Sequence, residues 1–200
     1  KALLLGAASY TSLDAVNIFY DKVVKYLIFG NVLKNNTYPL SVSAERIIQA
    51  LEIVAYAKKI GASYIAHGST GAGNDQVRFD MIFHIMLPGI EIITPIRDLK
   101  LSREDEIAYL KSKGVEMNFD KAVYSINKGL WGTSVGGKET LNSNGMLPEE
   151  AWPTQRTKDG SEEVKLRFEK GELKGVNDKS FDHPVDAIQH LQDLSGPYGI

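Results

Sequence analysis

The spacing of apolar residues along the chain predicts that short strands alternate with amphipathic helices. The opening residues KALLLGA read as the last turns of a helix that ends at Gly6, so we expect the sequence to begin inside a longer protein. Residues 9–14 suit a short strand, and Asp14 can cap the helix that follows. The apolar face expected for that helix consists of Val16, Phe19, Val23, Leu27 and Ile28.

The same alternation recurs between residues 43 and 96. A helical pattern from Ser43 to Ile60 stops at Gly61 and leads directly into the β-prone segment 63–67. A glycine-rich turn at 68–73 then opens another helix, and the run 90–96 reads as a buried strand. The apolar faces expected for the two helices are Ile47, Leu51, Val54 and Ala57 in the first, and Val77, Met81 and Ile82 in the second.

A further helix is marked by its end signals. In LSREDEIAYLKSKG, Ser102 and Asp105 have the spacing of a capping box, and Gly114 is the expected C-cap. Strands that alternate with helices imply a parallel sheet with helices on its faces. The fold class predicted for this part of the chain is therefore α/β.

The pattern changes beyond Val115. Residues 136–162 are polar and have few periodic apolar positions, a hairpin turn is expected near Gly171, and a helix is expected from Pro184 to Leu194, with Gly196 just beyond its end. We therefore expect two domains: residues 1–118, and residues 119–200 as an incomplete α+β part.

Composition narrows the classes of function. The chain is 43% hydrophobic and 24% charged with a formal net charge of -2, which indicates neither a nucleic-acid nor a membrane partner. It has no cysteine, and its four histidines show no metal-ligand spacing, so we expect no disulfide, no thiolate chemistry and no protein-bound metal. No apolar run approaches the ~20 residues that span a bilayer. A cytoplasmic enzyme is the expectation that follows.

The turn at 68–73 is the first candidate for chemistry. Such a turn between a strand and a helix exposes backbone N–H groups where the helix dipole favours an anion, and Gly68, Gly71 and Gly73 fit this geometry. A purely structural turn would look the same. Beside it, one turn of chain gathers four polar side chains, which could equally be an Asn cap and a solvated Asp–Arg pair: Thr70, Asn74, Asp75 and Arg78.

Two other segments carry candidate polar residues. Ser43 stands near the start of a predicted helix, where its usual meaning is an N-cap. The segment YSINKGLWGTS places Ser125 and Ser134 nine residues apart around an aromatic, glycine-rich loop, whose alternative interpretation is a structural loop with a packed Trp131.

Taken together, the three segments resemble the argininosuccinate synthase family, ATP-dependent ligases that join citrulline and aspartate. AHGSTGAGNDQVRFD is similar to the family signature AHG-x-TG-x-GNDQVRF, and Tyr38 and Ser43 match a family Tyr and Ser at the same distance from it. YSINKGLWGTS is similar to the family's YS-x-x-x-NLW-x-x-S. The resemblance implies a nucleotide-binding domain of the adenine nucleotide α-hydrolase type over residues 1–118, followed by part of a synthetase and multimerisation domain.

The resemblance also implies roles for individual residues. Aspartate would meet Thr70, Asn74 and Asp75. Citrulline would be held by Tyr38, Ser43, Asn74, Arg78, Ser125 and Ser134, and ATP would be bordered by His67, Gly68, Gly71, Gly73 and Arg46. None of these is assigned as a general acid or base.

The chemistry implied is adenylation of citrulline followed by attack of the aspartate amine, with release of pyrophosphate and AMP. Mg²⁺ is expected with ATP, although no ligand for it is identifiable in the sequence. A homotetramer is expected for the full-length protein.

The sequence departs from the family pattern in several places. It lacks the family's SGG-x-DTS phosphate-binding loop, and the 200 residues alone are expected to be inactive. Ala72 replaces a common Lys, Ile47 a Pro, and Gly129 an Asn. Two alternatives stay open: another adenylating or sulfur-transfer enzyme of the same fold, or a non-catalytic ligand-binding or regulatory paralogue.

Overall fold

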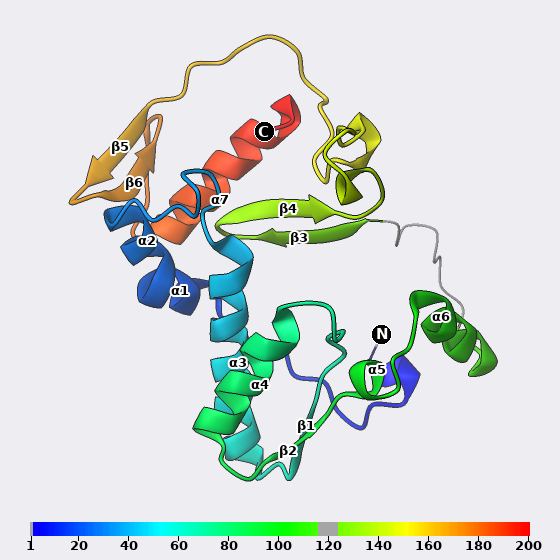
Figure 1. Ribbon diagram of the computed structural model, residues 1–200. Helices are drawn as coiled ribbons and strands as arrows, with labels where there is room; N and C mark the ends of the chain where they lie inside the picture. The colour runs from blue at the N-terminus through cyan, green and yellow to red at the C-terminus, as the bar shows by residue number, and fades with distance from the viewer. Residues whose placement is uncertain (1, 116–123) are drawn as a thin grey trace. The chain divides into compact units, whose positions relative to one another are not determined.

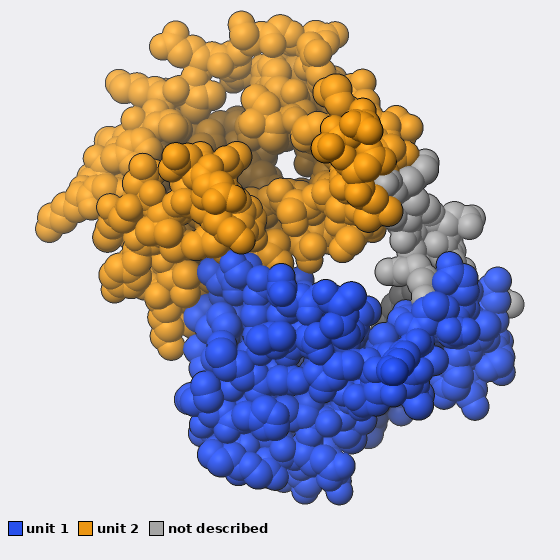
Figure 2. Space-filling model, viewed as in Figure 1, with its two compact units in different colours: residues 1–15, 43–121 blue, residues 16–42, 122–200 orange. Residues whose placement is uncertain are grey.

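The computed structural model describes residues 2–115 and 124–200, and the chain divides into two compact units (Figure 2). Unit 1 consists of residues 1–15 and 43–121, and unit 2 of residues 16–42 and 122–200. Residues 16–42 thus group with the later part of the chain. The predicted domain boundary between residues 118 and 119 lies outside the described residues and stays a prediction.

Helices and short strands alternate between residues 41 and 98 (Figure 1). The strands are β1 (Tyr64–Ala66), β2 (Glu91–Ile93), β3 (Ser125–Gly129), β4 (Gly132–Gly136), β5 (Leu166–Glu169), β6 (Glu172–Val176) and β7 (Lys179–Ser180). The α-helices are α1 (Val16–Phe19), α2 (Lys25–Phe29), α3 (Ser41–Ile60), α4 (Asp75–Met86), α5 (Pro95–Asp98), α6 (Arg103–Ser112) and α7 (Pro184–Ser195). A π-helix at Tyr20–Val24 joins α1 to α2, and 3-10 turns lie at Leu3–Leu5, Lys138–Leu141, Glu149–Ala151 and Gly196–Tyr198.

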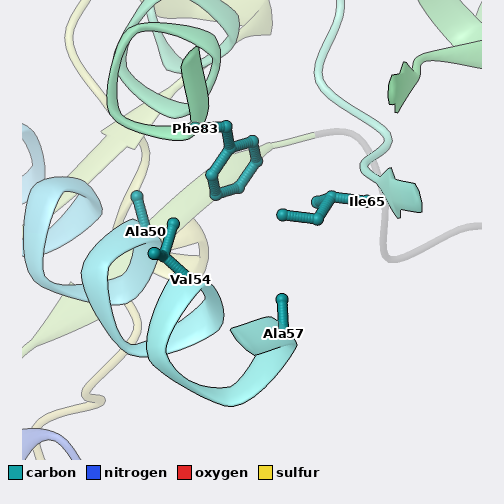
Figure 3. Packing of buried hydrophobic residues seen from close by; sticks show 5 residues of the cluster. All are labelled: Ala50, Val54, Ala57, Ile65 and Phe83. Carbon is teal, nitrogen blue, oxygen red and sulfur yellow. The ribbon is translucent and has the colours of Figure 1, made fainter. Parts of the chain in front are cut away.

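Unit 1 is built on a parallel pair of strands packed against two helices. β1 pairs with β2 in parallel, with Ile65 opposite Ile92. In Figure 3, small side chains of α3 face Phe83 of α4 and Ile65 of β1, and all of these residues are buried. The parallel pairing and the mixture of helices and strands confirm the predicted α/β class.

The helical faces that form this core differ in part from the predicted ones. On α3, Val54 and Ala57 are buried as expected, but Ile48 and Ala50 lie inside, whereas the predicted Ile47 and Leu51 are only half-buried. On α4, the packing of Ile82 against the core is confirmed.

The rest of the predicted α4 face is wrong: Val77 and Met81 are exposed, and Phe83 fills the interior. Burial of the larger Phe83 ring against β1 orients the helix, because aromatic side chains remove the most apolar surface from water.

Two predictions for the first 30 residues are wrong. Residues 9–14 form no strand: Tyr10 and Leu13 are exposed, so no apolar burial offsets the entropy of ordering that segment. In the helix that follows, the wider π turn shifts the side chains relative to a 3.6-residue period. As a result Phe19 is buried as expected, but the other buried residues of this helical segment are Tyr20 and Val24, which were not predicted.

Unit 2 contains two antiparallel arrangements. β3 and β4 form a hairpin, and β5, β6 and β7 form a sheet in that order. The predicted turn near Gly171 is confirmed, since Lys170 and Gly171 both have positive φ (51° and 86°), as a two-residue hairpin turn of the primed type requires. Helix α7 packs Ala187 against Val176 of β6.

The predicted helix ends agree with the structure in most cases. Gly6 and Gly114 adopt left-handed conformations (φ 93° and 73°), and the capping box of Ser102 and Asp105 is formed. At the end of α7, however, Gly196 is right-handed and continues into a 3-10 turn, so the left-handed residue is Gly199. None of the helices in the described ranges is long and apolar enough to cross a membrane.

Candidate functional site

The glycine-rich segment of the sequence forms an exposed loop from the carboxyl end of β1 to the start of α4. Gly68, Thr70, Gly71, Gly73 and Asn74 are all exposed. None of these glycines has a positive φ, so their lack of a Cβ is not required by a left-handed backbone. The strand–loop–helix context expected for an anion-binding turn is therefore present, with its backbone open to a ligand.

Asp75, the first residue of α4, is held between two guanidinium groups. Arg46 Nε donates to Asp75 Oδ2 at 3.1 Å, and Arg78 Nη1 donates to Asp75 Oδ1 at 2.7 Å. The side chains of Arg46 and Arg78 are only 18% and 26% exposed. The Asp–Arg pair of the alternative interpretation is therefore formed, but it is half-buried and a third residue, Arg46, joins it.

The alternative of an Asn cap at this helix is correct in position only. Asn74 is the N-cap residue of α4, and its carbonyl accepts from the Arg78 amide at 3.2 Å. Its backbone is right-handed (φ -79°, ψ -13°), and its side chain makes no capping hydrogen bond. Capping of the helix therefore does not explain the asparagine side chain at this position.

Arg46 reaches Asp75 from α3, where it is further restrained by its own helix. Its Nη1 donates to Gln49 Oε1 at 3.1 Å, and Gln49 in turn donates to Glu45 at 2.8 Å. The structure therefore brings Arg46, predicted to border ATP, together with Asp75 and Arg78, predicted to meet the amino-acid substrates.

His67 begins the loop, and its ring is joined to Asp80 of α4. The His67 amide donates to the Ile93 carbonyl at 3.1 Å, which extends the parallel pairing beyond β1. The Ser69 amide donates to His67 Nδ1 at 3.3 Å, so that nitrogen is the acceptor and the proton lies on Nε2. His67 Nε2 then donates to Asp80 Oδ1 at 2.8 Å.

Asp80 also receives the guanidinium of Arg97 from α5. Arg97 Nη1 donates to Asp80 Oδ2 at 2.5 Å. Burial by itself raises the pKa of Asp80, but the hydrogen bonds from Arg97 and His67 outweigh burial and hold that pKa below its ordinary value. The bond to Asp80 likewise raises the pKa of Arg97. Asp80 is therefore an ionised carboxylate that links α4 to both the loop and α5.

Gln76 completes this second network. Its Nε2 donates to the Gly71 carbonyl at 2.6 Å, and its Oε1 accepts from Arg97 Nη1 at 3.0 Å. Gly71 itself lies close to Arg97: a Cβ placed on it would stand 3.6 Å from Arg97 Cγ. The middle of the loop is thus tied to the same side chains as its beginning.

Gln76, Asp80 and Arg97 are not among the site residues predicted from the sequence. Gln76 and Asp80 are four residues apart and therefore share one face of α4, a signal that was available. Arg97 follows β2 as His67 follows β1, and the carboxyl ends of parallel strands meet at one edge of a sheet. The pairing of those two strands would have placed Arg97 near the loop.

Tyr38, predicted to hold citrulline, lies three residues before the start of α3. Its hydroxyl accepts from the Val42 amide at 3.1 Å, and so satisfies one of the unpaired donors of the first helical turn. Because α3 begins at Ser41, Ser43 lies within that first turn. The interpretation of Ser43 as an N-cap is therefore wrong.

Ser125 and Ser134 lie on the two strands of the β3–β4 hairpin. Ser134 is opposite Asn127, and Ser125 is two residues before Asn127 on the same strand. Side chains two apart on one strand share a face, so both serines lie on one side of the hairpin as diagonal neighbours. The spacing of nine residues thus brings the two hydroxyls to a common surface.

The hairpin turn agrees with both interpretations of this loop, as a packed structural element and as a support for Ser125 and Ser134. Trp131 lies in the two-residue connection and is half-buried, with its indole Nε1 shielded from solvent. Gly132, which follows it, lies against the start of α3: a Cβ there would stand 3.6 Å from Ser41 Oγ. The loop is packed, as the structural interpretation requires, and still presents the serines.

A metal site is not evident in the described part of the chain. Within residues 2–115 and 124–200, His, Asp and Glu side chains form no group of three that could hold an ion. Both carboxylates beside the loop, Asp75 and Asp80, are already paired with arginines. These residues do not form a dedicated Mg²⁺ site.

A parallel α/β unit in which an exposed glycine-rich loop leads from the carboxyl end of a strand into a helix is typical of one class: α/β domains that bind anionic ligands such as nucleotides. Comparison with known proteins makes the class specific. The family model described as the argininosuccinate synthase N-terminal HUP domain matches residues 1–116. This chain therefore belongs to the argininosuccinate synthase family.

Individual relatives agree with this match. The chain is 38% identical to the argininosuccinate synthase of Sulfolobus acidocaldarius over 200 residues, which are 100% of this chain and 51% of the relative. It is 36% identical to that of Sulfurisphaera tokodaii over the same shares, and 37% identical to that of Staphylococcus carnosus over 214 aligned residues. The chain spans about half the length of the curated relatives it matches.

Proposed function

We propose that the protein containing this chain is an ATP-dependent carbon–nitrogen ligase that joins citrulline and aspartate into argininosuccinate in arginine biosynthesis. The observation that carries the proposal is the open loop 67–74 with its arginine-braced Asp75, in a chain of this family. The ligand groups are anionic: three carboxylates and a triphosphate. Such groups need amide donors, hydroxyls and guanidinium groups, which this loop and its surroundings supply.

The amino-acid substrates would use the residues at the start of α4. Thr70, Asn74 and Asp75 bind aspartate in this proposal. A carboxylate has about four acceptor positions, and the two arginines use two of those on Asp75, so it can still accept from an ammonium group. Citrulline is bound by residues with hydroxyl, amide or guanidinium groups: Tyr38, Ser43, Asn74, Arg78, Ser125 and Ser134.

ATP would lie along the loop itself. His67, Gly68, Gly71 and Gly73 border it through backbone groups, and Arg46 adds a positive charge held in place by Asp75. Mg²⁺ bound with ATP would be carried mainly by phosphate oxygens and water, as this cation prefers. The full-length protein is proposed to be a cytoplasmic homotetramer.

The reaction proposed has two displacement steps. The ureido oxygen of citrulline attacks the α-phosphorus of ATP, the bond to the bridging β-oxygen breaks, and pyrophosphate leaves. The aspartate amine then attacks the ureido carbon, and AMP leaves as a proton is lost from nitrogen. Both steps depend on alignment of bound reactants, which can lower a barrier by about 7–11 kcal/mol.

The test is product formation by the full-length protein. We expect AMP and pyrophosphate only when ATP, citrulline and aspartate are all present, with one AMP formed for each argininosuccinate. Citrulline binding without any turnover would instead support a non-catalytic paralogue. AMP formation with another acceptor but not with citrulline would support a different adenylating enzyme.

A further inference from the structure

We propose that Gln76, Asp80 and Arg97 form a clamp that fixes the shape of loop 67–74, and that these three are positioning residues for the reaction. This inference rests on the proposed function, because the loop is where the reactants are proposed to meet. None of the three is among the residues assigned to bind a substrate. They affect the loop indirectly, through hydrogen bonds to the His67 ring and the Gly71 carbonyl.

The first part of the clamp fixes the start of the loop. Asp80 accepts from His67 Nε2 at 2.8 Å, and Phe79 and Phe83 on α4 pack near the His67 ring. His67 is only 11% exposed at its side chain. The ring cannot rotate without losing both the hydrogen bond and this aromatic packing.

The second part fixes the middle of the loop. Gln76 donates to the Gly71 carbonyl, which orients the peptide between Gly71 and Ala72. Because the C=O and N–H of one peptide point in opposite directions, the Ala72 N–H is turned away from Gln76. Residues 70–74 are exposed, so the loop has little packing of its own to set that direction.

Arg97 joins the two parts. A single nitrogen, Nη1, donates to both Gln76 Oε1 and Asp80 Oδ2. The chain of contacts therefore runs from His67 through Asp80, Arg97 and Gln76 to Gly71, and both ends of it are loop residues. A shift of one member changes the partner available to the next, as expected of a connected polar network.

The side chains are buried enough for these contacts to matter. Arg97 and Asp80 are 29% and 21% exposed at their side chains, so water screens them less than it does an exposed pair. Arg97 is also anchored by its helix: α5 begins at Pro95, and the buried Thr94 before it donates to Asp98.

The test uses three substitutions in the full-length protein. Gln76→Met keeps the side-chain length but loses both amide contacts, Arg97→Met removes the link, and Arg97→Lys keeps the charge without the planar donor group. For Gln76→Met and Arg97→Met we expect kcat to fall by roughly 10- to 100-fold, since a displacement of about 1 Å at a reacting centre has that effect. Arg97→Lys should recover part of the loss. Glu104→Gln, at an exposed position of α6, is the matched control and should behave as wild type.

A second readout separates this inference from the proposed function. Hydrogen exchange of the Ser69 amide, which donates to His67 Nδ1, should accelerate by up to about tenfold in Arg97→Met, with exchange in α3 unchanged, because Asp80 then loses a partner that holds it against the His67 ring. This result is expected even if the wild-type protein shows no ligase activity, in which case only the proposed function fails. Wild-type exchange of the loop, or exchange that rises equally in α3, would overturn the clamp. So would wild-type kcat and KM in all three variants.

Discussion

The two units use charged side chains in different ways. In unit 1, Asp75 and Asp80 are half-buried, each is shared by more than one partner, and both stand beside an exposed loop. In unit 2, Lys158 pairs with Glu162 at 2.9 Å, and Tyr198 donates to the same carboxylate at 2.7 Å, but the Lys158 and Glu162 side chains are 54% and 44% exposed.

This difference distinguishes a candidate site from an ordinary polar surface. An exposed ion pair is screened by water and loses side-chain entropy when it forms, so its net contribution is small. A half-buried charge with several partners is held in one geometry, and that geometry can orient a ligand or a loop. We therefore expect the contacts of Asp75 and Asp80 in unit 1 to matter more than the exposed Lys158–Glu162 pair in unit 2.

The largest effect on stability is expected from the apolar core of unit 1, which holds α4 and its charged residues in place. Phe83 is buried on α4 between α3 and β1, so Phe83→Ala leaves a cavity and should lower the free energy of unfolding of this unit by about 3–5 kcal/mol. Hydrogen exchange of α4 amides measures this loss. Amides of β6 and α7, in the other unit, serve as an internal reference.

The matched control is Ile85→Ala on the same helix, where the side chain is 65% exposed. It should leave exchange in α4 close to that of wild type. Equal effects of the two substitutions would mean that α4 is not held by this core.

The next effect concerns ligand binding by the charges beside the loop. Arg78→Ala should weaken citrulline binding by more than about 1.5 kcal/mol, because it deletes a charge-assisted contact and leaves Asp75 with one guanidinium partner fewer. Calorimetric titration of the full-length protein with citrulline measures it.

Lys59→Ala, an exposed cation at the far end of α3, is the control and should bind citrulline like wild type. An unchanged dissociation constant in Arg78→Ala would place citrulline elsewhere.

Much of this site could be predicted from the sequence, and the part that could not has a physical cause. The strand–loop–helix order around 64–86 was predictable because Gly61, the β-prone SYIAH and the glycine-rich turn are local signals. The pairing of Asp80 with His67 and Arg97 depends on three elements distant in sequence. Local periodicity does not encode which face of α4 turns toward β1, which is also why Val77 and Met81 were placed inside.

The errors near the N-terminus have a related cause. The π turn at Tyr20–Val24 changes the helical period without a distinctive residue, so the apolar face expected after Val16 shifted by one position at Val24.

The hairpin at Lys170–Gly171 was predictable because its turn needs positive φ at both positions.

A smaller effect is expected from the pH dependence of the Asp80 network. The pKa of Asp80 is lowered in the folded protein, so its contacts contribute stability above the unfolded value of about 3.8, and this contribution is lost as the pH falls through the folded pKa. Asp80→Asn should therefore lower the midpoint of thermal unfolding near pH 7. The difference from wild type should narrow in acid, because the contribution of the carboxylate is lost as the pH falls below 3.8 and through the lowered folded pKa.

Asp159→Asn, whose side chain is 95% exposed, controls for the loss of a carboxylate in itself. Its unfolding midpoint should match that of wild type at both pH values. A difference for Asp80→Asn that did not change with pH would mean that the side chain acts through packing and not through its charge.

The smallest effect is expected in unit 2, and it completes the comparison. Glu162→Gln removes the charge that faces Lys158 but keeps a carbonyl oxygen that can accept from Tyr198. Because these side chains are largely solvated, water replaces the lost partner, and the unfolding midpoint should stay within experimental error of wild type. Asp80→Asn makes the same kind of change in unit 1, where the carboxylate also has two partners but is less exposed, so the two variants measured together at one pH isolate the effect of burial. If Glu162→Gln were as destabilising as Asp80→Asn, the contribution of a carboxylate to stability would not depend on its burial. The half-buried carboxylates of unit 1 would then not be distinguished from an ordinary polar surface.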